Sequence, residues 1–279
     1  MKDLPDLPDG IPSVQNYKAL LESDFFRSME QYSDNFLSSN KSVLEDYMKK
    51  WVADPLHQWS RQWEYPFVYA KVREQARRKP RLKILDAGSG VTFFPYFLNE
   101  SLNASLHCLD YDRTLSAIFD DIKTGRGKIE EFSAANLSDI PYEDKSFDTV
   151  YCISVLEHTD DYEKIIKEFL RVLRPDGSLV VTFDVSLDGT RDISVDRAGL
   201  LLSSLAKYFK TDSTICDDFH ACISDPNIFT TRTAYEIDPN LLPWKAPGLL
   251  SRIKSFVTSG RIGSWPPLLS VVCLKLTPM

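Results

Sequence analysis

The feature of this sequence that most constrains its fold is an apolar strand that runs into a glycine-containing turn. Residues 84–92 read Ile-Leu-Asp-Ala-Gly-Ser-Gly-Val-Thr. Glycines at 88 and 90 let the backbone pass close to a ligand where any side chain would collide, and a helix N-terminus after such a turn presents N–H groups to that ligand. A dinucleotide-binding GxGxxG motif would need glycine where this chain has Phe93, so a dinucleotide is disfavoured.

Strands and helices alternate from about residue 82 to residue 184. Apolar runs predict strands at 82–85, 105–109, 149–154 and 178–183, and an apolar stripe at helical spacing predicts a helix that begins near 161. This alternation is typical of a parallel sheet with helices on both faces. A strong final strand is predicted at 268–276, and a sixth strand at either 214–223 or 229–235.

The segment that precedes the alternating region is predicted to be helical. From about residue 17 to residue 78, apolar residues recur at spacings of three and four, and three of the five tryptophans, Trp51, Trp59 and Trp63, lie here. Such a block is either a lid over an active site or a packing cap. We therefore expect a helical cap or lid at 1–80 and a core at 81–279, with an irregular insertion at about 211–264.

Charge and cysteine usage exclude several classes of protein. The net charge of −7, from 33 basic and 40 acidic side chains, argues against a nucleic-acid surface. Five cysteines without a CxxC pair suggest neither disulfides nor a zinc site. No apolar run is long enough to span a bilayer, and the N-terminus lacks the pattern of a secretory signal. We expect a cytoplasmic protein, and its oligomeric state stays open.

Further landmarks follow the glycine turn in order. Asp110 ends the next strand, where a carboxylate can accept hydrogen bonds from both ribose hydroxyls of an adenosine. The stretches 135–142, 154–158 and 173–177 come next. In this order and spacing the parts resemble the class I S-adenosylmethionine-dependent methyltransferases, from about residue 82 to residue 183. The resemblance implies an α/β fold with a doubly wound, mainly parallel, seven-stranded Rossmann-like sheet, and S-adenosylmethionine as cofactor.

The resemblance also implies a role for individual residues. The glycine turn would surround the methionine end of the cofactor, Asp110 and Tyr111 would hold the ribose and adenine, Asn136 and Leu137 would meet the adenine edge, and the end of the fourth strand would lie beneath the sulfonium. The cofactor-binding residues expected on this basis are Asp86, Gly88, Ser89, Gly90, Asp110, Tyr111, Asn136, Leu137, Ile153 and Ser154. Family members often have a third glycine where this chain has Thr92, and aspartate at the position of Asn136, whose side-chain oxygen can still accept a hydrogen bond.

The acceptor is indicated by looser similarities. Trp63-Glu64-Tyr65-Pro66, Phe94-Pro95 and Ser186-Leu187-Asp188-Gly189 look like segments of methyltransferases from polysaccharide and natural-product gene clusters. They favour O-methylation of a sugar or glycan terminus. An N-methyltransferase of a small-molecule amine is the alternative, and a non-catalytic S-adenosylmethionine-binding protein is the alternative of another class.

Candidate catalytic groups lie on the rim after the fourth and fifth predicted strands. A hydroxyl acceptor must lose a proton, and a placed base contributes about 10²–10⁴-fold to the rate. His158 is the leading candidate, and Glu157, Asp184 and Asp188 are rim carboxylates that could take its place. Asp184 and Asp188 are hard oxygen ligands, but the two alone do not make a metal site, and we expect none.

Overall fold

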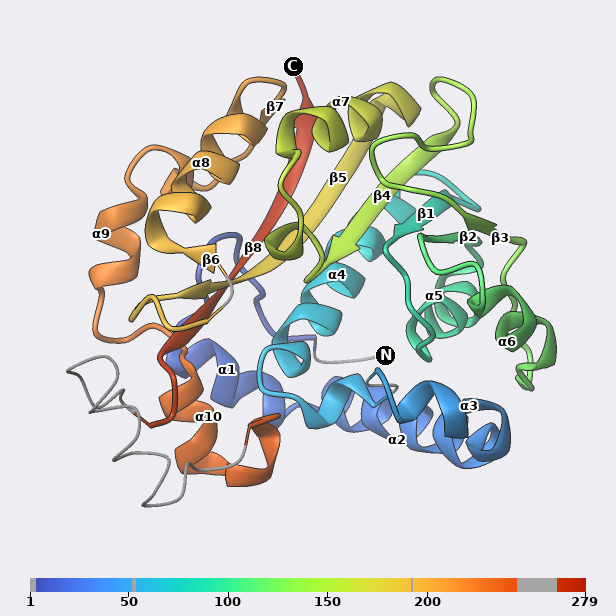
Figure 1. Cartoon of the computed structure of the whole chain (residues 1–279), viewed down its shortest axis with the longest axis horizontal. Coiled ribbons are helices and arrows are strands. Elements are labelled where there is room, and N and C mark those ends of the chain that lie inside the picture. Colours follow the sequence, from blue (N-terminus) through green and yellow to red (C-terminus); the bar gives the residue numbers. More distant parts are fainter. Residues whose placement is uncertain (1–3, 52–53, 192, 245–264) are drawn as a thin grey trace.

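The computed structural model describes residues 4–51, 54–191, 193–244 and 265–279. Four helices precede the first strand, and strands and helices then alternate (Figure 1). The helices are α1 (Val14–Leu21), α2 (Asp24–Ser39), α3 (Lys41–Met48), α4 (Arg61–Ala76), α5 (Phe94–Leu102), α6 (Leu115–Asp121), α7 (Tyr162–Val172), α8 (Val195–Ala206), α9 (Phe219–Ser224) and α10 (Thr231–Ile237). The strands are β1 (Lys83–Ala87), β2 (Ser105–Asp110), β3 (Glu131–Ala134), β4 (Phe147–Ile153), β5 (Leu173–Ser186), β6 (Ile193–Ser194), β7 (Phe209–Lys210) and β8 (Leu269–Pro278).

The strands form one mixed sheet in the order β3-β2-β1-β4-β5-β8-β7, and β6 pairs with β5 off this path. Strands β3, β2, β1, β4 and β5 run parallel, whereas β8 is antiparallel to β5 and to β7. The doubly wound, mainly parallel sheet predicted from the sequence is confirmed. The strand order reverses between β1 and β4, and in open α/β sheets a ligand binds in the crevice outside the carboxyl ends of the strands at such a point.

Each face of the sheet carries its own apolar core. Alternate residues of a strand point to opposite faces, so Ile84 of β1 joins the core that the N-terminal helices and α5 cover, and its neighbour Leu85 joins the core under α7 and α8. Helix α7 presents Ile165, Ile166 and Phe169 to the second core. This period of three and four residues is the one that the sequence showed.

Helix α4 connects the N-terminal helices to the sheet. It packs on α5 and on β4, β5 and β8, and every residue from Gln62 to Ala70 is buried. Because residues on all sides of this helix are buried, it contributes to the apolar core. The boundary expected at residue 80 therefore does not fall between two separately packed bodies.

The prediction for the sixth strand was wrong. The strand is the two-residue β7, Phe209–Lys210, and the segments proposed for it hold the 3-10 turn Thr214–Cys216 with α9 and the helix α10. Phe209 pairs with Pro278 and is buried, so two residues suffice to extend the sheet past β8. The described part of the segment expected to be irregular is thus partly helical, and residues 245–264 lie outside the described residues.

Candidate active site

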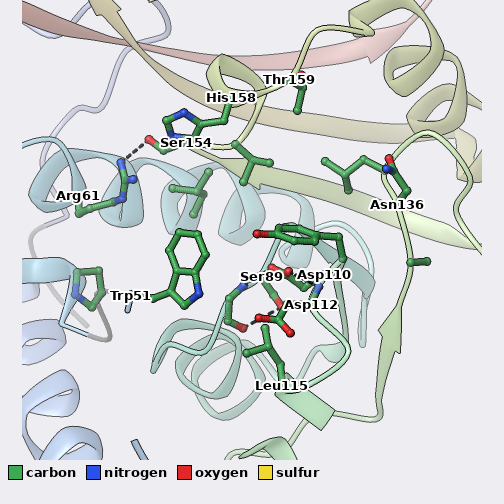
Figure 2. A pocket seen from close by; sticks show the side chains of 18 of the residues that line it. Trp51, Arg61, Ser89, Asp110, Asp112, Leu115, Asn136, Ser154, His158 and Thr159 are labelled. Carbon is green, nitrogen blue, oxygen red and sulfur yellow. Dashed lines mark hydrogen bonds between the residues drawn. The ribbon is translucent and has the colours of Figure 1, made fainter. Parts of the chain in front are cut away.

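A cavity of about 760 Å³ opens at the carboxyl ends of β1, β2 and β4, where the strand order reverses. Its volume lies in the range of about 300–1,000 Å³ typical of small-molecule sites. Figure 2 shows the side chains that converge on it from the sheet and from the N-terminal helices. The lining residues that come from the expected set are Gly88, Ser89, Gly90, Asp110, Tyr111, Asn136, Leu137, Ile153, Ser154 and His158.

The glycine turn between β1 and α5 has the geometry for which only glycine is suited. Gly88 and Gly90 both have positive φ, 83° and 49°. A Cβ on Gly88 would lie 2.6 Å from Cγ2 of Val155, and one on Gly90 would lie 2.7 Å from the hydroxyl of Tyr47. Side chains at these two positions would therefore collide with both walls of the crevice, which explains the Gly-Ser-Gly sequence.

The backbone N–H groups of the turn are already bonded within the protein. Gly88 and Ser89 donate to the carbonyl of Leu109, at 2.8 and 3.0 Å. The N–H of Gly90 donates to Oδ2 of Asp110 at 2.9 Å, and that of Val91 donates to the hydroxyl of Tyr47 at 2.9 Å. The sequence predicted that N–H groups of the helix after the turn face a ligand, whereas these four groups belong to the turn itself and are bonded within the protein. The glycines therefore let the backbone pass close to the cavity, while the N–H groups of the turn bond to the end of β2 and to Tyr47 of α3 and so connect these two walls.

Asp86 lies beneath the turn and not on the cavity wall. It is 5% exposed and accepts a hydrogen bond of 2.7 Å from the hydroxyl of Tyr151. Burial raises the pKa of Asp86 to about 8, although the bond from Tyr151 opposes the shift. Neither Asp86 nor Tyr151 is among the described residues that line the cavity, so this hydrogen bond lies within the core next to the turn.

One end of the cavity, where the sequence predicts the nucleoside and which we call the nucleoside end, is built around Asp110. One carboxylate oxygen accepts from the N–H of Gly90 and the other from the N–H of Asp112, at 2.9 and 3.0 Å, so the side chain is fixed and only 9% exposed. A carboxylate oxygen has two lone pairs, which leaves each oxygen able to accept one ribose hydroxyl as well. Tyr111 is 69% exposed beside it, an open ring face suited to an adenine.

The far side of the nucleoside end comes from the segment after β3. Asn136 is exposed, and its Oδ1 accepts from the N–H of Ser138 at 3.0 Å, which closes a small turn. Leu137 is buried against the second core and lines the cavity. Figure 2 places Asn136 across the cavity from Asp110 and Leu115. An adenine ring between these walls would meet polar groups at its edge and apolar groups on its faces.

At the end of β4, Ser154 is held in a left-handed backbone conformation with φ of 49°. Such a conformation is uncommon outside glycine, and a network of hydrogen bonds to its side chain fixes it. Ser154 Oγ donates to Oε1 of Glu64 at 2.7 Å and accepts from Nη1 of Arg61. Glu64 is fully buried and also accepts from Thr182 of β5 at 2.5 Å. Helix α4 therefore clamps the ends of β4 and β5 together.

Of the four catalytic candidates only His158 lines the cavity, although the N–H of Asp184 donates to Oε1 of Glu157 at 3.3 Å. His158 is exposed and lines the cavity beside Ser154 (Figure 2). Glu157 is buried behind the wall, where burial and Glu64 raise its pKa to about 8 against the opposing charge of Arg61. Asp184 and Asp188 do not line the cavity, and Asp188 accepts from Ser186, Thr190 and the N–H of Leu268. In the described part of the chain, no three His, Cys, Asp or Glu side chains are grouped to hold a metal ion.

The N-terminal helices supply one wall of the cavity, but not through all of their tryptophans. Trp51 lines the cavity and is 43% exposed, and Tyr65 lines it from α4. Trp59 and Trp63 lie in the apolar core, 2% and 0% exposed, so these two side chains pack the helices and do not line the cavity. Apolar spacing alone does not separate a core tryptophan from one that lines a cavity.

Three polar lining residues of the N-terminal segment were not predicted from the sequence. They are Tyr47, Gln58 and Arg61. Arg61 and Tyr65 are four residues apart and so lie on one face of α4, which is the only sequence signal that links an arginine to the cleft. Arg61 is also the single lysine or arginine among the described residues that line the cavity.

Comparison with known proteins identifies the class of this site. Residues 85–181 match the family model of a methyltransferase domain. The chain is 30% identical over 112 residues to the methyltransferase GfsG of Streptomyces halstedii, which covers 39% of this chain and 40% of that protein. It is 26% identical over 114 residues to the glycine/sarcosine/dimethylglycine N-methyltransferase of Actinopolyspora halophila, over 40% of this chain and 20% of that protein.

These matches span less than half of each of the two curated relatives. Among solved structures, the [4+2]-cyclase SpnF aligns with 89% of this chain and 96% of its own, at 16% identity and a TM-score of 0.49. The family match, the strand order and the glycine turn with Asp110 together define a nucleoside-binding α/β domain. The chain carries a class I S-adenosylmethionine-dependent methyltransferase domain, and its cofactor is S-adenosylmethionine.

Proposed function

We propose that this chain transfers the methyl group of S-adenosylmethionine to a hydroxyl of a small polar acceptor, a sugar or a glycan terminus. The observation that carries the proposal is the position of His158, an exposed histidine on the cavity wall next to Ser154 at the end of β4. It is the one histidine among the described residues that line the cavity. A base at this position can reach a hydroxyl that approaches the methyl group.

For this reaction the main contribution of the protein is to align the methyl group of the cofactor with the acceptor oxygen. The cofactor supplies a methyl group on a positively charged sulfur, which an acceptor oxygen displaces. Holding two reactants in line contributes on the order of 7–11 kcal/mol. Asp110 and the glycine turn would fix the donor, and Gln58 offers a polar side chain elsewhere on the cavity wall. His158 would take the hydroxyl proton as the new bond forms, and histidine is suited to this near neutral pH.

Two features of the walls support a small hydroxylated acceptor. Trp51 presents an exposed ring at the cavity wall, and such a ring offers a flat apolar face with a polar N–H handle. Of the residues that carry the similarity to polysaccharide and natural-product methyltransferases, Tyr65 lines the cavity. The acidic net charge counts against nucleic acid as the acceptor.

An amine acceptor is the second candidate. Relatives named as N-methyltransferases, such as phosphoethanolamine N-methyltransferase of Triticum aestivum (24% identical over 104 residues), favour it. An amine needs only to arrive uncharged, so its methylation would not depend on His158. A protein that binds the cofactor without catalysis is the third candidate, and turnover with any acceptor separates it from the first two.

The experiment is a methyl-transfer assay on the purified chain with panels of hydroxylated and amino acceptors. His158→Ala is compared with His220→Ala, which removes an exposed histidine of α9 away from the cavity. We expect His158→Ala to lower turnover by about 10²–10⁴-fold at nearly unchanged cofactor affinity, with His220→Ala close to the unsubstituted chain. If the turnover of a folded His158→Ala protein fell by less than threefold, His158 would not be the base, and the amine acceptor would be favoured.

A further inference from the structure

The methionine end of S-adenosylmethionine carries a carboxylate, and this anion needs donors in the cavity. Near the glycine turn the natural donors would be backbone N–H groups. Those of Gly88, Ser89, Gly90 and Val91 all donate within the protein, to Leu109, Asp110 and Tyr47. A buried anion without donors is strongly unfavourable. Because these four N–H groups are engaged, we look for a side-chain donor on the cavity wall.

Arg61 is the candidate, as the single lysine or arginine among the described residues that line the cavity. Its side chain is 21% exposed, so it is largely enclosed but reaches the cavity surface. Figure 2 shows it projecting from α4 between Ser154 and Trp51. The two carboxylates of the wall, Asp110 and Asp112, lie at the nucleoside end.

The guanidinium is held in place by one of its nitrogens. Nη1 donates to Ser60 Oγ at 3.0 Å, to Glu64 Oε2 at 2.5 Å and to Ser154 Oγ. Among the described residues, no hydrogen bond uses Nε or Nη2 of Arg61. These two nitrogens form the side of the guanidinium that binds a carboxylate through two parallel hydrogen bonds. The orienting contacts and the free side are thus on different edges of the group.

The charge balance around Arg61 keeps it positive. Burial disfavours its charged form, but Glu64, Asp184 and Glu157 outweigh that effect and raise its pKa. Glu64 pairs with it directly. The arginine therefore stays charged.

We infer that Arg61 binds the methionine carboxylate of S-adenosylmethionine through Nε and Nη2, so that the N-terminal helices complete the cofactor site. This inference deepens the proposed function and depends on the cofactor, but not on the identity of the acceptor. It makes α4 part of the cofactor site: Arg61 would hold the carboxylate, while Glu64, through Ser154, holds the end of β4.

The test compares two ligands that differ only in the carboxylate. Calorimetry measures S-adenosylhomocysteine and S-adenosyl-3-thiopropylamine, its decarboxylated form, on the unsubstituted chain, on Arg61→Lys, and on the double variant Arg61→Gln/Glu64→Gln, which avoids an unpaired buried Glu64. Arg77→Gln removes an exposed arginine at the far end of the same helix and serves as the control. Circular dichroism checks the folding of each variant.

We expect the double variant to bind S-adenosylhomocysteine about ten- to hundredfold more weakly, and the decarboxylated ligand within threefold of the unsubstituted chain. Arg61→Lys should fall between, because it keeps the charge but loses the planar pair of donors. Equal losses for both ligands, or an unchanged affinity for S-adenosylhomocysteine in a folded variant, would overturn the inference. The second of these results would assign Arg61 to an acceptor. If the unsubstituted chain bound neither ligand, the proposed function itself would fail.

Discussion

Removing the carboxylate of Asp110 is the perturbation that bears most directly on the nucleoside end of the site. In the structure, each carboxylate oxygen of Asp110 accepts a hydrogen bond from a backbone N–H group. The side chain ties Gly90 to the end of β2 and orders the start of the following loop at Asp112. Each oxygen keeps a lone pair toward the cavity, where the ribose hydroxyls would donate.

The expected magnitude follows from these bonds. Hydrogen bonds to a charged acceptor contribute about 1.5–3 kcal/mol, and about 1.4 kcal/mol is tenfold in affinity. Asp110→Ala should therefore weaken S-adenosylhomocysteine by about one to two decades. It should also lower stability, because the N–H groups of Gly90 and Asp112 lose their partners, at about 1–3 kcal/mol for each one left buried.

Calorimetry on Asp110→Ala and on Asp160→Ala separates the two effects. Asp160 is an exposed aspartate that pairs with Arg197 away from the cavity, so its removal controls for the lost charge. Thermal unfolding of each variant without ligand gives the cost to stability. If the folded Asp110→Ala protein binds S-adenosylhomocysteine within threefold of the unsubstituted chain, the assignment of Asp110 to the ribose is refuted.

Three further outcomes follow from the packing. Gly88→Ala should destabilise the chain more than Gly189→Ala, because both glycines have positive φ but only at Gly88 would a Cβ meet another side chain, Val155 at 2.6 Å; equal unfolding temperatures for the two variants would contradict the close approach. Glu157→Gln should flatten the pH dependence of the free energy of unfolding. Because the pKa of Glu157 is raised in the folded state, the stability that this side chain contributes is complete below about pH 4.5 and is lost as the pH rises through about 8. A variant that loses stability from pH 5 to pH 9 as steeply as the unsubstituted chain would count against this. A chain that begins at Lys79 should fold poorly, since it lacks α4 and uncovers β4 and β5; circular dichroism and turnover measure this, and full activity would exclude any role for the N-terminal helices in the site.

The parts of the fold that the sequence predicted are those with a short-range signal. Strands β1, β2, β4 and β5 are apolar runs, and α7 repeats at helical spacing, so each was placed to within a few residues. The strand β7 has two residues and is defined by its pairing with Pro278 and Thr277, which no local pattern encodes. It was therefore sought in longer apolar segments that are helical in the structure.

The residues of the site likewise fall into two groups, those that a local sequence motif indicates and those that only the packing brings to the cavity. The glycine turn, Asp110 and the end of β4 follow from motifs that are local in sequence, and the structure gathers them around one cavity. The contribution of α4 depends on how a helix crosses the sheet, so the sequence left Arg61 and Glu64 unassigned, although Glu64 bonds to both Ser154 and Thr182. Tyr47 bonds to the N–H of Val91 from α3, and its spacing along the helix gave no sign of that contact.

Among the described residues no helix is long and apolar enough to cross a membrane. All five cysteines are free thiols, and three of them are buried.

The most direct measurement is to follow a methyl group from cofactor to acceptor. The purified chain is incubated with S-adenosylmethionine carrying a trideuterated methyl group and with the hydroxylated and amino acceptor panels, and mass spectrometry detects both products. The proposed function predicts S-adenosylhomocysteine together with an equal amount of a trideuteromethyl ether on a hydroxylated acceptor, and loss of both products in His158→Ala. Cofactor binding with no labelled product on any acceptor, or a label found only on amines and unchanged in His158→Ala, would contradict it.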